Sequence, residues 1–315
     1  MNKTGLVIND ACRKHDTGEG HPESIARYDA VMKHLRGQPW FDLLELRESG
    51  IAPGVHPGLC HDPSYIKLVD REVRSGRQQL STGDTLISAG SLKAAHAAVN
   101  GGVLAVDQVI SGKWDHAFCV VRPPGHHARP AQGMGFCLFN NIAIAARYAQ
   151  KEHGVGKVLV VDWDVHHGNG TQDIFYRDES VYYFSTHQSP WFPGTGDEAE
   201  TGTGKGLGST MNCPFPAGTG RKEILGAFED RLGKAMQQFK PELVLVSAGF
   251  DSRTQDPLGQ FRLQDEDFRD LTTCMQTLAD THAEGRLISM LEGGYNLAGL
   301  ATAAGTHVKT LLDPA

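Results

Sequence analysis

Five short apolar runs, rich in Val, Ile, Leu and Phe, recur along the chain between longer stretches that have helical periodicity. The runs are residues 117–121, 158–161, 181–184, 243–246 and 287–291. Nearly continuous hydrophobicity of this length is typical of strands buried on both faces of a sheet. The stretches with amphipathic helical periodicity are residues 91–110, 140–153, 221–239 and 264–284. This alternation predicts an α/β fold in which helices cover both faces of a mostly parallel central sheet.

The 315 residues contain no repeat, low-complexity tract or Pro/Ser-rich linker that would divide the chain. Hydrophobic residues make up 40% of the sequence and charged residues 21%, as in an ordinary globular protein with a sizeable core. We therefore predict a single catalytic domain over residues 1–315. Long loops are expected at residues 9–23, 185–208 and 251–263.

Charge and cysteine content narrow the classes of partner. A net charge of −7 and the lack of any Lys/Arg-rich run argue against nucleic-acid binding. The six cysteines show no CxxC or paired spacing, which indicates free thiols in a reducing compartment. We recognise no targeting segment and no apolar run of membrane-spanning length, so the expected location is the cytoplasm, with no membrane partner.

Unusual polar residues follow each predicted strand. The five segments are Arg122 to His127, Asp162 to Gly170, Ser185 to His187, Ser247 to Asp251 and Glu292 to Tyr295. In open α/β sheets, ligands bind beyond the carboxyl ends of the strands. Because five segments carry such residues to the same edge, we place the functional site there.

A metal centre is the first chemistry that these residues permit. Asp164 and His166 are two residues apart, so in an extended segment both side chains point the same way. Asp251 would supply a third ligand, which is the number that a catalytic zinc takes from the protein. Two carboxylates with one imidazole also leave Fe(II) or Co(II) open. Taken singly, each residue could instead be an ordinary loop side chain without a metal.

Acid–base groups lie beside the predicted metal ligands. His126 and His127 follow a rigid Pro-Pro-Gly turn, and their imidazoles suit a general base and a general acid. Asp162 and Asn169 flank the metal motif and could each orient one histidine. A carboxylate favours the charged imidazolium more than an amide does, so the two histidines should differ in role.

Tyr295 follows two glycines, which allow the backbone to turn sharply and bring the phenol close to a ligand. A phenol opposite a metal can complete an oxyanion site. The alternative is a tyrosine that packs over the edge of the sheet. Gly135, Phe136 and Phe192 could line a narrow apolar channel to the metal, although both phenylalanines could also be core residues.

Six ordered motifs together resemble the zinc-dependent histone deacetylase family, which includes bacterial acetylpolyamine amidohydrolases. The similarity runs from about His21 to the C-terminus. The motifs span residues 122–128, 135–141, 162–170, 193–196, 249–251 and 292–295. The resemblance implies a three-layer α/β/α arginase-like fold, one zinc ion per chain and hydrolysis of acetyl amides.

The resemblance also implies roles for single residues. Asp164, His166 and Asp251 are similar to the zinc ligands, and Tyr295 to the tyrosine that polarises the carbonyl. His127 would be the principal proton shuttle, His126 would act mainly through its charge, and Asp162 and Asn169 would orient them. Gly135, Phe136 and Phe192 resemble the acyl-lysine channel, Asp84 the rim carboxylate that binds substrate amides, and Arg27 the basic residue of an internal acetate-release cavity.

The family's structural potassium sites are implied as well. One would involve Asp162, Asp164, His166, Ser185 and Thr186. The second would involve Phe175, Asp178, Val181 and Ser209, largely through backbone carbonyls.

Subtype features bear on the substrate. Asn169 and the 135–141 motif are similar to class II members, and Tyr295 favours an active enzyme. Leu258 stands where a polyamine-selective relative carries a gatekeeping glutamate. We therefore expect N-acetyl-lysine in proteins or peptides as the substrate, with acetylpolyamines or other small acylated amines as the alternative, and homo-oligomers are possible.

Two further alternatives differ in chemistry. A di-manganese ureohydrolase on the same fold would need a bridging carboxylate two residues after Asp251, where this chain has Arg253. A catalytically silent acyl-group binding protein would not need the reacting residues, all of which are present. Both therefore fit the sequence less well than a deacetylase.

Overall fold

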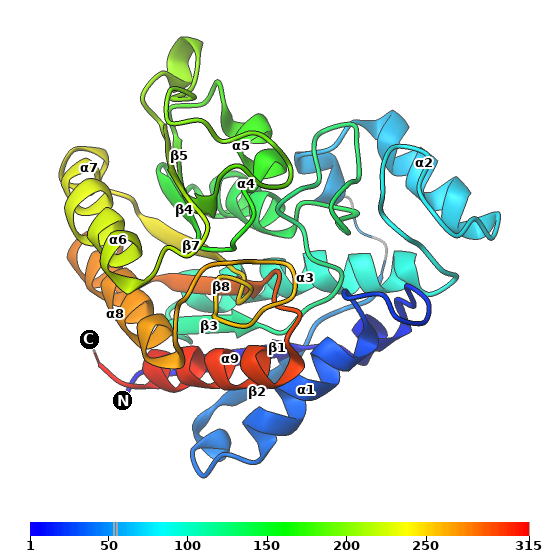
Figure 1. Ribbon diagram of the computed structural model, residues 1–315, viewed down its shortest axis with the longest axis horizontal. Coiled ribbons are helices and arrows are strands. Elements are labelled where there is room, and N and C mark those ends of the chain that lie inside the picture. The colour runs from blue at the N-terminus through cyan, green and yellow to red at the C-terminus, as the bar shows by residue number, and fades with distance from the viewer. Residues whose placement is uncertain (53, 55, 315) are drawn as a thin grey trace.

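The computed structural model describes residues 1–52, 54 and 56–314, and all its strands belong to one parallel sheet (Figure 1). Every neighbouring pair of strands is parallel. The strands are β1 (Thr4–Ile8), β2 (Glu45–Glu48), β3 (His116–Cys119), β4 (Val158–Asp162), β5 (Val181–Gln188), β6 (Thr210–Phe215), β7 (Leu243–Ala248) and β8 (Leu287–Leu291).

The order of the strands across the sheet is β2-β1-β3-β8-β7-β4-β5-β6. The last two strands in the sequence, β7 and β8, therefore lie in the middle, between β3 and β4. As all strands are parallel, the segments that leave β3, β8, β7 and β4 start side by side at one edge of the sheet.

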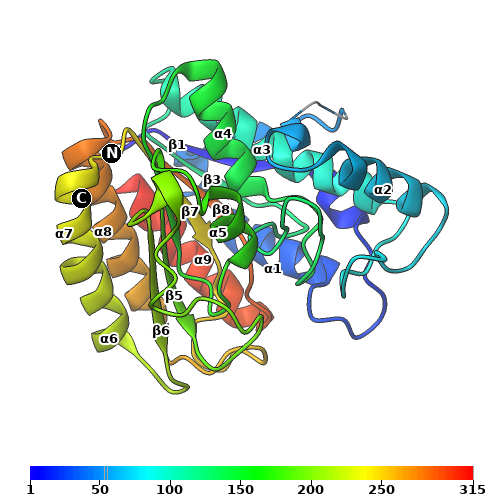
Figure 2. The ribbon, with the colours of Figure 1, turned by 90° about the horizontal axis from the view of Figure 1, so that it is seen from above.

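Helices form a layer on each face of the sheet (Figure 2). On one face, α3 packs against β1, β3 and β8, and α4 packs against α3 and β7; on the other, α8 and α9 pack together and α9 packs against α1. The helices are α1 (Ile25–Arg36), α2 (Pro63–Arg74), α3 (Ser91–Ile110), α4 (Asn141–His153), α5 (Asn169–Phe175), α6 (Arg221–Gly226), α7 (Gly233–Phe239), α8 (Asp265–His282) and α9 (Leu297–Leu312). The predicted three-layer α/β/α architecture is confirmed.

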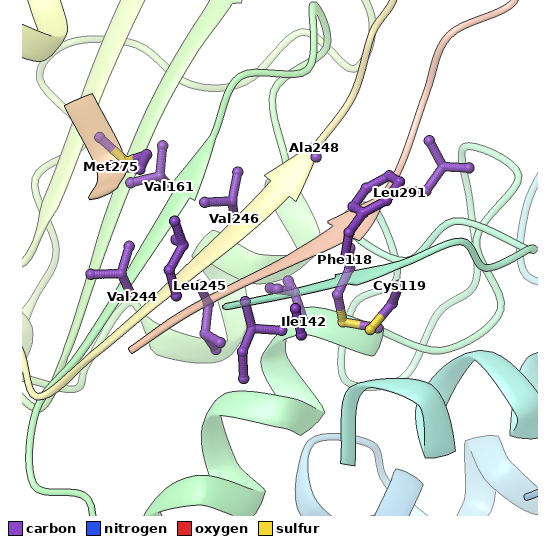
Figure 3. Packing of buried hydrophobic residues seen from close by; sticks show 14 of the residues in the cluster. Phe118, Cys119, Ile142, Val161, Val244, Leu245, Val246, Ala248, Met275 and Leu291 are labelled. Atoms are coloured by element: carbon purple, nitrogen blue, oxygen red, sulfur yellow. The ribbon is translucent and has the colours of Figure 1, made fainter. Parts of the chain in front are cut away.

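The core lies on both sides of the central strands. Successive residues of β7 point to opposite faces, so all of its side chains are buried although they alternate in direction. Met275 of α8 and Ile142 of α4 lie on opposite sides of these strands (Figure 3). Burial on both faces explains why the central strands are continuously apolar in sequence.

The five predicted strands and four predicted helical stretches are confirmed, with differences at their ends. Strand β5 continues through Gln188, so the loop predicted from Ser185 begins too early. Ser185 to Gln188 are polar but buried, and they pair with β6. Residues 221–239 are one helical stretch interrupted by a π-helical turn, Ala227–Leu232. The predicted 9–23 loop contains a short 3₁₀ helix at Asp10–Lys14.

The six cysteines are free thiols, as expected. Among the described residues, the helices are all too short or too polar to cross a membrane.

Candidate metal centre and active site

Four loops from adjacent strands meet above the carboxyl edge of the sheet. Residues 122–127 follow β3, residues 292–295 follow β8, residues 249–251 follow β7, and residues 163–168 follow β4. The predicted site residues come from these loops. The strand order therefore brings together segments that are up to about half the chain apart in sequence.

Asp164, His166 and Asp251 form a buried cluster, and one potential ligand atom from each lies within 4.8 Å of the others. His166 Nδ1 is 3.0 Å from Asp164 Oδ1 and 3.2 Å from Asp251 Oδ2. Strand β4 ends at Asp162, so Asp164 and His166 lie on a bend rather than in an extended segment. The three predicted ligands therefore lie together. The predicted reason, alternation of side chains along an extended segment, was wrong.

Backbone N–H groups orient both carboxylates of this cluster. Asp164 accepts hydrogen bonds from Gly293 N at 2.8 Å and from His166 N at 2.9 Å, while Asp251 accepts one from Val165 N at 2.9 Å. A Cβ atom at Gly293 would overlap with both Asp251 and Asp164. Glycine is therefore required for this close approach of the backbone to the two carboxylates.

The electrostatics of the cluster favour a bound cation. Burial and the nearby charge of Asp164 raise the pKa of Asp251 to about 7. Burial disfavours the charged form of His166, but hydrogen bonds with Asp164 and Asp251 outweigh it and raise its pKa to about 10. Two buried carboxylates and one imidazole thus bind positive charge tightly. Their donor set, two oxygens and one nitrogen, fits a divalent metal such as zinc with a coordination position left open.

The tandem histidines lie next to the cluster, with ring centroids 4.0 Å apart. His126 Nδ1 lies 3.0 Å from Asp162 Oδ2, and His127 Nδ1 lies 2.8 Å from Asn169 Oδ1. The predicted pairing of each histidine with its orienting residue is confirmed.

The two histidines differ in charge, as their partners imply. Burial opposes the charge on His126, but Asp162, Asp164 and Glu292 outweigh it and raise the pKa of His126 to about 10. Burial, together with the positive charges of His126 and His166, holds the pKa of His127 well below its usual value. His126 therefore carries positive charge, while His127 is neutral and can accept a proton.

Glu292 is a site residue to which sequence reasoning gave no role. Its carboxylate is fully buried and accepts hydrogen bonds from Gly125 N at 2.6 Å and His126 N at 3.2 Å. It thereby fixes the turn that carries both histidines. The signal was present in the sequence as an acidic residue at the end of a buried strand.

Tyr295 lies beside the cluster, between Arg27 and Phe136. The Arg27 guanidinium carbon lies 5.0 Å from the centroid of the Tyr295 ring, and the Phe136 ring packs edge-on at 6.0 Å. Burial raises the pKa of Tyr295 well above its usual value, and the charge of Arg27 only partly opposes this. The phenol therefore stays protonated and can donate a hydrogen bond.

An apolar pocket of about 230 Å³ leads to the metal cluster. Its lining comprises Asp84, His127, Gly135, Phe136, His166, Trp191, Phe192, Leu258 and Tyr295. The predicted substrate-binding residues therefore all lie in one pocket with His127, His166 and Tyr295. Trp191 was missed, although it is the residue directly before the predicted channel residue Phe192 in the printed sequence.

The two predicted channel phenylalanines line the pocket rather than the core. The Phe192 ring is 42% exposed and packs edge-on at 5.2 Å from His127 and at 6.2 Å from His166. Phe136 has a φ of 68°, which is uncommon for a residue with a side chain. Gly135, with a φ of 55°, precedes it, and its N–H donates to Asp84 Oδ1 at 2.7 Å.

Arg27 belongs to a buried ion-pair network beneath Tyr295. Its guanidinium donates to Glu23 Oε1 at 2.9 Å, to Gly294 O at 2.7 Å and to the carbonyl of Glu292. Glu23 also pairs with the fully buried Arg122. Arg27 thus supports the backbone on both sides of Gly293, while its predicted role in acetate release stays a prediction. The two potassium sites likewise stay predictions.

The comparisons with known proteins agree with this geometry. A family model described as "Histone deacetylase domain" matches residues 21–311. "Probable deacetylase" from Archaeoglobus fulgidus is 34% identical, over 99% of this chain and 89% of its own length. The "Histone deacetylase-like amidohydrolase" of Pseudomonas aeruginosa is 41% identical, over 89% of this chain and 73% of its own length. The human "Polyamine deacetylase HDAC10" is 43% identical over 82% of this chain, which spans only 40% of that protein.

A solved structure titled "Crystal Structure of HDA15 HD domain" superimposes with a TM-score of 0.93 at 33% identity, covering 100% of this chain and 89% of that one. Arg253, at the position where a ureohydrolase would need a bridging carboxylate, is paired with Asp265 at 2.6 Å. Zinc dependence is the norm of the matched family. The chain therefore belongs to the histone deacetylase family, has the arginase/deacetylase fold, and is a hydrolase that acts on amide bonds.

Proposed function

We propose that this protein is a zinc-dependent deacetylase that hydrolyses the acetyl amide of N-acetyl-lysine in proteins or peptides. One observation carries the proposal. His127, His166 and Tyr295 line a single narrow apolar pocket; Asp164 and Asp251 contact His166, and His126 contacts His127. Such a pocket suits an aliphatic arm that ends in a polar amide.

Asp164, His166 and Asp251 would hold the zinc ion through two carboxylate oxygens and His166 Nδ1. When bound, zinc supplies a Lewis acid that lowers the pKa of a water molecule and polarises the amide carbonyl.

His127 has the geometry of the general base. Its Nδ1 faces Asn169 Oδ1, an acceptor, and Asn169 Nδ2 in turn faces the Met134 sulfur at 3.4 Å. This arrangement places the ring proton on Nδ1 and leaves Nε2 free to accept a proton from the attacking water. The same proton can then pass to the departing amine nitrogen as the C–N bond breaks.

His126 and Tyr295 would stabilise the charge that develops during the attack. His126 is held as imidazolium by Asp162, so its positive charge is already in place before the reaction. The protonated phenol of Tyr295 can donate a hydrogen bond to the carbonyl oxygen as it gains negative charge. Neither group needs to move a proton.

Leu258 supports lysine over a polyamine as the substrate. An acetylpolyamine carries at least one free ammonium group along its chain, which gains from a carboxylate in the pocket wall. Leu258 offers no carboxylate, although the exposed Asp84 also lines the pocket. Acetylpolyamines are the second candidate, because the relative HDAC10 is named a polyamine deacetylase.

The substrate is tested by measuring kcat/KM for an acetyl-lysine peptide and for acetylputrescine with the same zinc-loaded enzyme. We expect the peptide to be preferred by at least about tenfold, the scale of about 1.4 kcal/mol for one unpaired or repelled polar group. Turnover of acetylputrescine alone would overturn the lysine assignment while leaving the deacetylase chemistry intact.

The mechanism is tested by Tyr295→Phe, which removes only the hydroxyl. We expect kcat for the peptide to fall about 100- to 1,000-fold, as when one oxyanion donor is lost. Zinc content, measured by atomic emission, should be unchanged because Tyr295 is not a ligand. Undiminished turnover would contradict the assigned role.

A further inference from the structure

The loop between β7 and α8 joins three parts of the site. Asp251 at its start belongs to the metal cluster, and Leu258 lines the pocket. Between them lies Asp256, whose side chain is almost completely buried at 8% exposure. Asp256 is neither one of the three potential metal ligands nor a lining residue of the pocket, so the chemistry above gives it no role.

The Asp256 carboxylate accepts hydrogen bonds from three backbone N–H groups. Oδ1 accepts from Leu258 N at 2.9 Å. Oδ2 accepts from Tyr295 N at 2.7 Å and from Asn296 N at 3.0 Å. One carboxylate thus connects the pocket-wall loop to the backbone of the residue that carries the phenol.

The rest of the loop shows why such a connection is needed. Gln255, directly before Asp256, has a φ of 66°, a conformation that costs free energy for a residue with a side chain. Asn296 Nδ2 donates to Gln255 O at 3.1 Å, which gives a second bond between the same two loops. These bonds hold a backbone conformation that the loop would not adopt alone.

The outer side of the loop is fixed independently. The Trp191 indole N–H donates to Leu258 O at 2.9 Å, and Gln188 and Gln260 exchange two hydrogen bonds, each 2.9 Å long. Leu258 is therefore held through its N–H by Asp256 and through its carbonyl by Trp191. The pocket wall cannot shift without disturbing Asp256.

We propose that Asp256 is a positioning residue that sets Leu258 and Tyr295 relative to each other, so that the width of the pocket and the place of the phenol are fixed together. The inference rests on the proposed deacetylase function. The three N–H donors occupy both carboxylate oxygens. These hydrogen bonds favour the ionised form, while burial raises the pKa of Asp256 above its usual value. An asparagine offers a single acceptor oxygen and turns an amide N–H towards one of the donors.

The test is a double-mutant cycle with Asp256→Asn and Tyr295→Phe. We expect Asp256→Asn to lower kcat for an acetyl-lysine peptide about 10- to 100-fold, the range for a misplaced reacting group. If Asp256 acts through the phenol, the same substitution should lower kcat less than about threefold in the Tyr295→Phe background. Equal losses in both backgrounds would overturn the inference.

Asp267→Asn is the matched control for general destabilisation. Asp267 is also a buried aspartate that accepts from a backbone N–H, that of Gln264 at 2.7 Å, but it lies at the start of α8. We expect it to lower the melting temperature without an effect on kcat that depends on Tyr295. The zinc content of every variant is measured alongside. If Asp256→Asn loses zinc, its lower kcat has a cause other than a displaced phenol, and this would count against positioning.

The cycle separates this inference from the proposed function. If Tyr295→Phe alone leaves turnover unchanged, the proposed function fails. If Tyr295→Phe is damaging and Asp256→Asn is equally damaging in both backgrounds, only the inference fails. Should Asp256→Asn not fold, Asp256→Glu keeps the charge and both oxygens on a longer arm, and the same non-additivity with Tyr295→Phe is expected of it.

A second measurement tests whether Asp256 positions Leu258. Asp256→Asn should also change the ratio of kcat/KM for acetyl-lysine and butyryl-lysine peptides by at least about threefold, because the wall that Leu258 forms is released. A fall in kcat with an unchanged ratio would contradict the joint positioning of Leu258 and Tyr295.

Discussion

The floor and the rim of the pocket are built in different ways. By the floor we mean the buried metal cluster of Asp164, His166 and Asp251 together with the tandem histidines; of these, His127 and His166 line the pocket. The rim consists of Asp84, Trp191, Phe192 and Leu258, which are all at least partly exposed and come from three loops. The floor determines which bond can be broken, whereas the rim determines which molecule reaches it. Motifs of a few residues therefore reveal the chemistry of this protein better than its substrate.

The largest effect is expected at the floor, from Asp251→Asn. Loss of one charged ligand should reduce bound zinc below one ion per chain and lower kcat/KM by roughly 1,000-fold or more, since Lewis-acid stabilisation is worth several kcal/mol. Atomic emission and peptide turnover measure these two quantities.

The same substitution should not weaken the metal-free fold. Repulsion from Asp164 and burial raise the pKa of Asp251 to about 7, so its ionised form is unfavourable in the folded protein. Removing that charge should leave the free energy of unfolding in the presence of a chelator unchanged or higher. A clear drop in the free energy of unfolding would show that the carboxylate of Asp251 stabilises the metal-free fold, which contradicts this prediction.

At the rim, Leu258→Glu should change selectivity rather than chemistry. A carboxylate in the pocket wall attracts the free ammonium of an acetylpolyamine and disfavours an acyl-lysine arm. We expect the ratio of kcat/KM for acetylputrescine to that for an acetyl-lysine peptide to rise about 10- to 100-fold. Zinc content should stay at the wild-type level. Loss of zinc in Leu258→Glu would contradict the separation of metal binding at the floor from selectivity at the rim.

The smallest effect concerns the 129–140 loop, which carries the pocket residues Gly135 and Phe136, and it depends on pH. His61 is buried beneath the 129–140 loop, where its Nε2 accepts from Asn140 N at 2.9 Å and its Nδ1 faces Arg129 O at 3.0 Å. Burial lowers the pKa of His61 from 6.5 to about 4. The unfolded chain therefore binds a proton at a higher pH than the folded protein, and stability falls as the pH falls below about 6.5.

Between about pH 6.5 and about pH 5, this histidine should contribute a loss of about 1.5 kcal/mol in the free energy of unfolding. Urea unfolding of the wild type and of His61→Gln at several pH values measures it. The variant keeps an acceptor and cannot be protonated in this range, so its stability should depend less on pH. Equal slopes for both proteins would rule out His61 as the source.

The sequence allowed the central part of the fold to be predicted, because strands buried on both faces are apolar at most positions. Strand β2 was missed because it lies at the edge of the sheet and reads Glu-Leu-Arg-Glu, mostly exposed. Strand β6 was missed because it contains Asn212 and Pro214. The polar second half of β5 was taken for a loop, since its side chains are buried by hydrogen bonding rather than by hydrophobicity.

The candidate site divides in the same way. Metal ligands and tandem histidines stand in short, ordered motifs, so their chemistry could be inferred before their geometry. Asp256 and Trp191 could not be, because what matters in them is a contact with a backbone group that sequence does not display. For Asp256, the sequence shows only an Asp-Pro pair and does not show that its carboxylate is buried.

The position of β7 and β8 between β3 and β4 has a consequence for how the protein is made. During synthesis from the N-terminus, β3 and β4 leave the ribosome long before the two strands that join them. Until then each has an unpaired edge, which is a template for aggregation. Asp251 and Tyr295 arrive with those last strands, so the catalytic centre can form only when the sheet closes. A nascent chain of this protein is thus inert until residue 295 has been synthesised, and it is most prone to aggregation while β3 and β4 still lack β7 and β8 between them.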